Sequence, residues 1–223
     1  MKTLQTIAYI IIASLLAVTT LTSCKNSDKY FKDVVDNKVN SNIMVDGIPL
    51  QYKGETVLNE PFSGRELSVV ESTLNTELQG VSGNEIFLQI NYLEFEPGDA
   101  SFMIEDGKLS FSTKSGNPAA ITKITGSIPS SLGLNYEIGT GSLKLSNLDS
   151  DQACNLVTGT GSIILRNCTI QNLAAKTGTG SISITDCLIE TADLETGTGN
   201  IDLLRSQIKD RNFSTGTGKV TEK

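Results

Sequence analysis

The chain has 223 residues, a net charge of −7 at pH 7, and neither histidine nor tryptophan. The missing histidine removes the commonest general base and metal ligand, and with it any Ser–His or Cys–His nucleophilic pair. The acidic balance excludes the basic footprint of a nucleic-acid-binding protein, so we expect no nucleic-acid partner. Aromatic residues are few, and the apolar residues are mostly Ile, Val and Leu. This mixture favours β-strands around a thin aliphatic core.

Residues 1–23 have the pattern of a secretory signal peptide. A lysine near the start, Lys2, precedes an apolar stretch from Ile7 to Val18 and then small polar residues. A membrane-spanning helix is the alternative, but the apolar run is shorter than the roughly 20 residues that a span requires. The four residues 21–24, Leu-Thr-Ser-Cys, resemble the bacterial lipobox. The resemblance implies that Cys24 is lipidated, becomes the first residue of the mature chain and anchors it to a membrane.

The residues after Cys24 bear on the location of the chain. Lys25 follows the cysteine, which under the sorting rule for such lipoproteins implies retention in the outer membrane. No acidic run follows that would mark export to the outer face, so the periplasmic and the surface face stay open. Residues 24–41 are polar and charged, which predicts a solvated, lipid-anchored tether, although Tyr30, Phe31, Val34 and Val35 have a spacing that also suits a short helix.

Residues 42–135 have the signals of strands without a strict period. Alternating segments occupy 64–73 and 84–95, and the segment 101–113 predicts a hairpin with Asp106-Gly107 at its turn. Another turn is expected at residues 97–99. One carboxylate cluster, Glu94, Glu96 and Asp99, is a candidate acid and base pair, but a solvated strand end is the simpler interpretation.

The second half of the chain repeats a Gly-Thr-Gly phrase, with first glycines at 139, 159, 178, 197 and 216. A nearly constant period of 19 residues is the signature of a solenoid, in which each copy buries its apolar face against the next. Copies aligned on the first glycine have apolar residues in the same columns, such as Leu143, Ile163, Ile182, Ile201 and Val220. The sequence therefore predicts an all-β fold, a single-stranded β-helix with coils of about 19 residues. It would occupy 42–223, with regular repeats over 137–220 and less regular coils before them. If the period held through the front half, there would be nine or ten coils.

The repeated glycines have two structural interpretations. Strict alternation from Ile163 and Leu165 would point Gly159 and Gly161 inward, where the opposite wall could approach closely. Alternatively, one of the two glycines turns a corner at positive φ. The phrase fits neither a phosphate-binding loop nor the aspartate-containing repeats that bind calcium, so we expect no cofactor and no metal.

The threonines of the repeat are expected to point outward in two ladders. A regular threonine array resembles the Thr-X-Thr surface of ice-binding antifreeze proteins, although threonine is also simply a good residue for an exposed strand. The first ladder is the candidate binding face. It contains Thr140, Thr160, Thr179, Thr198 and Thr217, and the second contains Thr158, Thr177, Thr196 and Thr215.

Three cysteines follow Cys24. Cys168 and Cys187 occupy the same column one rung apart, so either a ladder of buried thiols or a Cys168–Cys187 disulfide is compatible with the spacing. With Cys154 the number is odd, which precludes complete pairing within the chain. A catalytic or zinc-binding role is disfavoured, because the chain contains neither a histidine base nor a Cys-X-X-Cys motif.

The run SIPSSLGLNYEIGTGSLKLSNL at 127–148, followed by repeated TGTGSI units, resembles the bacterial putative-adhesin family of β-strand repeats. A related group is the head GIN domain putative autotransporter adhesins. The resemblance extends from Ser41 to the C-terminus and is strongest over 127–220. The chain departs from the family pattern at the position after the second glycine, where it has Ser, Asn or Lys instead of Asp. The resemblance implies a β-solenoid with a surface or envelope role, and it transfers no catalytic residues.

These observations lead to three functional hypotheses. The first is a non-enzymatic envelope lipoprotein that adheres to a glycan or protein, and the second is a structural lipoprotein that faces the periplasm and acts through a protein partner or in envelope stress. The third is a polysaccharide-acting enzyme, which is disfavoured because the outward column of Lys144, Ile164, Ser183 and Asp202 has no catalytic cluster. Charges on the final rung, from Lys219, Glu222 and Lys223, favour a monomer.

Overall fold

The computed structural model describes residues 38–39 and 43–223. The predicted signal peptide, Cys24 and most of the predicted tether lie outside these residues. The fold lies in the second of two units of the chain, Ser41–Lys223. Its described part consists of β-strands and turns and contains no helix, which confirms the all-β prediction.

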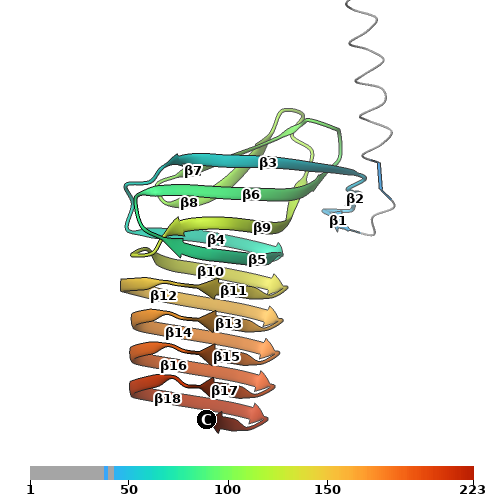
Figure 1. Cartoon of the computed structure of the whole chain (residues 1–223). Helices are drawn as coiled ribbons and strands as arrows, with labels where there is room; N and C mark the ends of the chain where they lie inside the picture. The colour runs from blue at the N-terminus through green and yellow to red at the C-terminus, as the bar shows by residue number, and fades with distance from the viewer. Residues whose placement is uncertain (1–37, 40–42) are drawn as a thin grey trace, which may run out of the picture. The chain divides into compact units, whose positions relative to one another are not determined.

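The repeat region forms the predicted β-solenoid, and it has five coils (Figure 1). Each coil has one long strand and one short strand, and equivalent strands of successive coils pair in parallel. The pairing is in register except for a shift in β12 between Ser150 and Ala153. The 19-residue period therefore corresponds to one complete turn of the chain. The pairs of strands are β10 (Gly133–Thr140) and β11 (Leu143–Ser146), β12 (Asp149–Thr160) and β13 (Ile163–Arg166), β14 (Thr169–Thr179) and β15 (Ile182–Thr185), β16 (Leu188–Thr198) and β17 (Ile201–Leu204), and β18 (Gln207–Thr217) and β19 (Val220–Glu222).

The front half departs from the predicted coils. Antiparallel pairing joins β3 (Tyr52–Pro61) to β6 (Glu85–Glu94) and β6 to β9 (Ala119–Pro129), while β7 (Ala100–Glu105) and β8 (Lys108–Thr113) form the predicted hairpin. The strands β4 (Glu66–Thr73) and β5 (Asn75–Val81) continue the parallel stack on β10 and β11, and on their other side they pair in parallel with β8 and β9. Two short strands, β1 (Met44–Val45) and β2 (Ile48–Pro49), pair separately.

The expectation of nine or ten coils was therefore wrong, because turn chemistry decides the direction of the chain. At the tip of the hairpin Asp106 and Gly107 have φ of 49° and 76°. Two consecutive residues with positive φ reverse the chain directly into an antiparallel neighbour. The Gly-Thr-Gly phrase instead turns it by one corner, so that the next strand continues around the coil.

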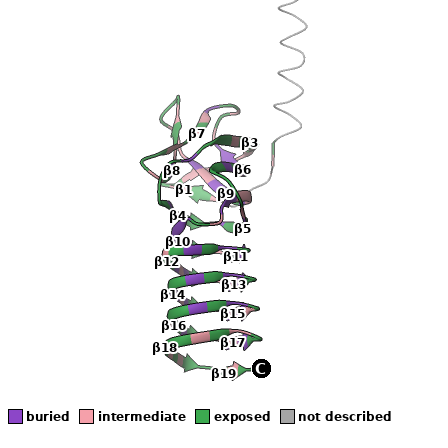
Figure 2. Cartoon of the chain, turned by 60° about the vertical axis from the view of Figure 1, so that its left-hand side comes forward, coloured by how far each residue is buried: buried purple, intermediate pink, exposed green. Residues whose placement is uncertain are grey.

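All strands except β1 and β2 form two facing sheets around one aliphatic core (Figure 2). One sheet has the order β18-β16-β14-β12-β10-β4-β8-β7, and the other β19-β17-β15-β13-β11-β5-β9-β6-β3. The predicted columns fill the space between them, and nearly all of their side chains are buried until the last coil. Burial of these Ile and Leu side chains, at about 1.5–3 kcal/mol each, is the main favourable term for a chain with so few aromatic residues.

Both kinds of glycine in the repeat contact the preceding coil, not the opposite wall. Gly180, the second glycine of its phrase, has φ of 144°. It therefore turns a corner at positive φ, which was the second interpretation. Gly178 is exposed, yet a Cβ built on it would lie 2.6 Å from the carbonyl oxygen of Gly159. The inward-pointing interpretation was wrong, because the corner interrupts the alternation of side chains.

Candidate functional site

The first threonine ladder lies on the surface, as predicted. Thr140, Thr160, Thr179, Thr198 and Thr217 are all exposed and pair in register from coil to coil. Thr73 of β4 pairs with Thr140 and adds a sixth member, which was not predicted because β4 lies outside the repeat. This ladder is one candidate binding surface.

The prediction of a second outward ladder was wrong. Thr158, Thr177 and Thr196 are buried, and the hydroxyls of Thr177 and Thr196 donate hydrogen bonds of 2.8 Å to the Gly161 and Gly180 carbonyl oxygens of the preceding coil. Thr215, on the last coil, is half-buried. These threonines therefore satisfy corner carbonyl groups inside the solenoid. The two-ladder surface on which the ice-binding hypothesis depended does not form.

A ladder of small polar residues lies on the other side of each glycine corner. The side chains of Asn75, Ser142, Ser181 and Asn200 accept hydrogen bonds from backbone N–H groups of the adjacent coil, at 3.1 to 3.4 Å. These side chains are held by the backbone. The corner is therefore a strip of small polar side chains beside the exposed threonines.

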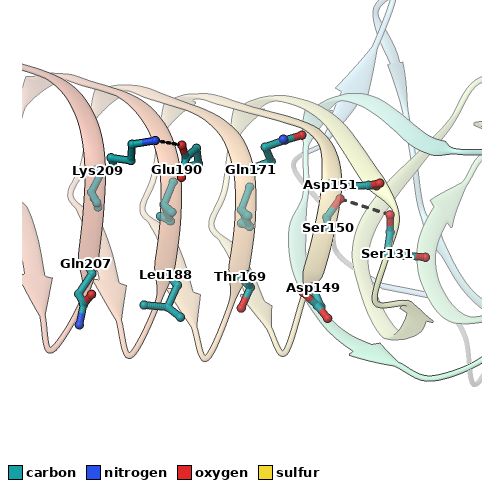
Figure 3. Close-up of a pocket in the computed structure, with 13 residues that line it drawn as sticks. Ser131, Asp149, Ser150, Asp151, Thr169, Gln171, Leu188, Glu190, Gln207 and Lys209 are labelled. Carbon is teal, nitrogen blue, oxygen red and sulfur yellow. Dashed lines mark hydrogen bonds and ion pairs between the residues drawn. The ribbon is translucent and has the colours of Figure 1, made fainter.

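A groove of about 760 Å³ lies on another face of the coils (Figure 3). Two rows of exposed side chains run along it, each with one residue from each of β12, β14, β16 and β18. The first row contains Asp149, Thr169, Leu188 and Gln207, and the second contains Asp151, Gln171, Glu190 and Lys209.

The floor of this groove belongs to the core. Ile170 and Ile189 lie between the rows with their side chains buried, and Ser150 occupies the same column. The next inward position after Ile170 is Leu173, three residues later, so the chain bends between them. This break in alternation is the signal in the sequence that marks this face, and the groove was not among the predicted sites.

The charges of the groove are unevenly distributed along it. Lys209 forms an ion pair with Glu190 at one end, whereas Asp149 and Asp151 lie at the other (Figure 3). The Gln152 amide donates a hydrogen bond of 2.6 Å to Asp151. Three carboxylates and one ammonium group therefore line the groove, which makes it mildly acidic with one acidic end.

The three cysteines of the fold are buried and unbonded, which supports the interpretation as buried thiols over the disulfide. The Cys168 amide donates to Cys187 Sγ at 3.4 Å, so the two residues stack as the period predicts. Burial raises the pKa of Cys154 to about 11. Its thiol is therefore protonated at neutral pH, and a protonated, buried thiol is a poor nucleophile.

The carboxylate cluster of the front half has a structural role. Glu94 is only 2 % exposed, not solvated as expected, and it accepts hydrogen bonds from the backbone of Gly98, Asp99 and Ala100. A hydrogen bond from the Ser115 hydroxyl lowers the pKa of Asp99. Both carboxylates thus hold the loop that leads into β7.

Among residues 38–39 and 43–223, no group of three or more His, Cys, Asp or Glu side chains is arranged to hold a metal ion. Within the same residues, no helix has the length and apolar character to cross a membrane.

Several solved structures resemble the fold at low sequence identity, whereas no curated protein matches the chain. A "putative cell adhesion protein" from Clostridium sporogenes ATCC 15579 is 12% identical over 76% of this chain and 98% of its own, with a TM-score of 0.48. A "putative adhesin" from Bacteroides fragilis NCTC 9343 is 14% identical over 76% and 97%, with a TM-score of 0.35. Another from Parabacteroides distasonis ATCC 8503 is 9% identical over 75% and 97%, with a TM-score of 0.31.

The family assignment rests on a model that spans most of the chain. The model described as "Toastrack DUF4097" matches residues 40–221, which include every strand except the last residue of β19. The chain therefore belongs to the toastrack DUF4097 family.

Proposed function

We propose that the chain is a non-enzymatic envelope lipoprotein, held at the outer membrane through Cys24, that uses its solenoid as an adhesion or binding module. The observation that carries the proposal is the groove, where parallel stacking holds one outward side chain from each of four coils in each of two rows. Binding surfaces benefit from such rigid supports because little conformational entropy is lost on association.

The chemistry of the described residues favours binding over catalysis. The cysteines are buried, and the front carboxylates Glu94 and Asp99 are engaged by the backbone and by Ser115. The groove carboxylate Glu190 is paired with Lys209. Each of these groups has a structural partner or lacks access to solvent, which disfavours it as a nucleophile or as a member of an acid and base pair.

A second candidate is a structural lipoprotein that faces the periplasm and acts through a protein partner. It is favoured by the residues after Cys24, Lys25-Asn26-Ser27-Asp28-Lys29, which lack an acidic run. In this case the same solenoid would contact another envelope component.

Protease shaving of intact cells, followed by immunoblotting for the solenoid, separates the two candidates. Loss of the signal on intact cells supports adhesion, whereas protection until lysis supports the periplasmic candidate. A Cys24→Ala variant that is recovered in the soluble fraction would support the lipid anchor, and one that stays with the membrane would contradict it.

A further inference from the structure

We propose that the groove binds an uncharged polysaccharide that lies along the solenoid axis, across the strands. This inference rests on the proposed binding function and specifies its ligand class. The groove lies between two rows of side chains that come from β12, β14, β16 and β18 (Figure 3).

The geometry favours an elongated polymer. Neighbouring strands are spaced by about 4.8 Å, so four coils give a groove of roughly 14 Å along the axis. The two rows are two residues apart along each strand, or about 6.6 Å. A narrow chain in this groove would meet a pair of side chains at every step of the solenoid.

The side chains suit a ligand rich in hydroxyl groups. Gln171 and Gln207 offer amide donors and acceptors, Thr169 offers a hydroxyl, and the carboxylates are acceptors. Leu188 is 54% exposed in the middle of its row, where it offers an apolar contact for the C–H face of a sugar ring. Small-ligand sites combine apolar contacts with a few polar groups that fix the orientation of the ligand.

An extended peptide is disfavoured as a groove ligand. Such peptides gain much of their affinity from backbone hydrogen bonds to a free strand edge. The floor residues Ile170 and Ile189 belong to β14 and β16, and each of these strands is paired on both sides. Their backbone groups are already used in the sheet, so a peptide could form only side-chain contacts there.

A polyanion is disfavoured by charge. The groove has three carboxylates, and its single ammonium group, on Lys209, is paired with Glu190. The whole chain also has a net charge of −7. Phosphate-rich or sulfated polymers would be repelled, because their binding depends on clustered Lys and Arg.

Affinity gel electrophoresis of the full chain in mild detergent tests this inference, with dextran, mannan and laminarin as neutral probes, heparin as the polyanion and poly-lysine as the basic peptide. We expect at least one neutral polysaccharide to retard the wild-type chain. We expect Gln171→Ala and Leu188→Ala to weaken that retardation at least about tenfold, which corresponds to about 1.4 kcal/mol. Thr179→Ala, an exposed change on the same strand but in the threonine ladder, is the matched control and should bind normally.

Three outcomes would overturn the proposal. The first is the absence of retardation by all three neutral probes, and the second is an equal loss of binding in Thr179→Ala, which would place the site on the threonine ladder. The third is that only poly-lysine retards the chain and that Asp149→Asn abolishes this retardation. That result would assign the groove to a basic peptide. Unfolding curves that coincide with the wild type must accompany each variant.

An adhesion assay separates this inference from the proposed function. If cells adhere only when they produce the chain, and Gln171→Ala cells adhere as well as wild type, the groove assignment fails and the adhesion function stands. If adhesion is the same with and without the chain, the proposed function itself fails.

Discussion

Arg211 and Glu222 form an ion pair of 2.7 Å on the last coil, at two positions that are apolar in the coils before it. Arg211 continues the column of Leu173 and Ala192, and Glu222 continues that of Ile184 and Leu203. A further strand pair stacked on β18 and β19 would have to bury both charges. Charges at inward positions are one way in which an exposed sheet edge is protected from pairing with another chain.

The double variant Arg211→Leu/Glu222→Leu tests this protective role. We expect concentration-dependent association through the exposed end, measured by size-exclusion chromatography with light scattering. The control Lys176→Leu/Asp193→Leu removes an ion pair of 3.1 Å from a lateral face and adds the same apolar area away from the end. Equal association of both variants would attribute the effect to apolar area alone, and a monomeric Arg211→Leu/Glu222→Leu variant would contradict the protective role.

The corner glycines should tolerate no side chain. Gly180→Ala would require an L-residue at φ of 144° and would direct its Cβ into the carbonyl oxygen of Gly161. Strain of this kind costs about 1–3 kcal/mol before the steric clash is added. We expect Gly180→Ala to lower the free energy of unfolding, measured in urea, by at least about 2 kcal/mol. The adjacent exposed substitution Thr179→Ala should change it by less than about 0.5 kcal/mol. A Gly180→Ala chain as stable as the wild type would show that the corner can relax.

The buried and exposed threonines should respond differently to the same substitution. Thr177→Val keeps the shape of the side chain but removes the hydrogen bond of 2.8 Å to the Gly161 carbonyl oxygen. The expected loss of unfolding free energy is about 1–2 kcal/mol. Thr179→Val, two residues away on the surface, should change it by less than about 0.5 kcal/mol. Equal effects would contradict the assignment of Thr177 to the interior.

Glu71 should make the stability of the solenoid depend on pH. Glu71 pairs in register with Ile138, which in turn pairs with the buried Thr158, so Glu71 begins this inward column. Burial raises the pKa of Glu71 from 4.5 to about 7. Between these two pKa values the folded state binds the proton more tightly than the unfolded state, so this group lowers stability as pH rises from about 4.5 to about 7. Because the carboxyl group is partly exposed, the expected change is roughly 1–2 kcal/mol.

Urea unfolding at pH 5.5 and pH 8 measures this dependence. Glu71→Gln should be more stable than the wild type at pH 8. Its unfolding free energy should also differ less between pH 5.5 and pH 8 than that of the wild type. Glu137→Gln, on the adjacent strand β10 with its side chain exposed, is the control and should keep the wild-type difference. An unchanged pH dependence in Glu71→Gln would contradict the role of this carboxyl group.

The sequence by itself determined the solenoid, because in-register stacking requires like residues at a fixed spacing. The period of 19 residues, the columns from Leu143 to Ile201 and the stacking of Cys168 on Cys187 follow from that requirement, and the structure contains all three. The Asp106-Gly107 hairpin was also readable, since its turn needs residues that accept positive φ.

The tertiary structure alone decided which side chains face outward. Period-2 alternation holds within a straight strand, but each corner shifts the pattern by one residue. The inward positions Thr158 and Ile163, Leu165 and Cys168, and Ile170 and Leu173 are odd numbers of residues apart. Alternation counted back from Ile163 through the corner therefore predicted the wrong orientation for Thr158 and for the glycines. The bend before Leu173 breaks the alternation in the same way, and the groove at that bend was not predicted. The packing of the front strands was likewise beyond the sequence pattern, because antiparallel partners far apart in the chain leave no period to read.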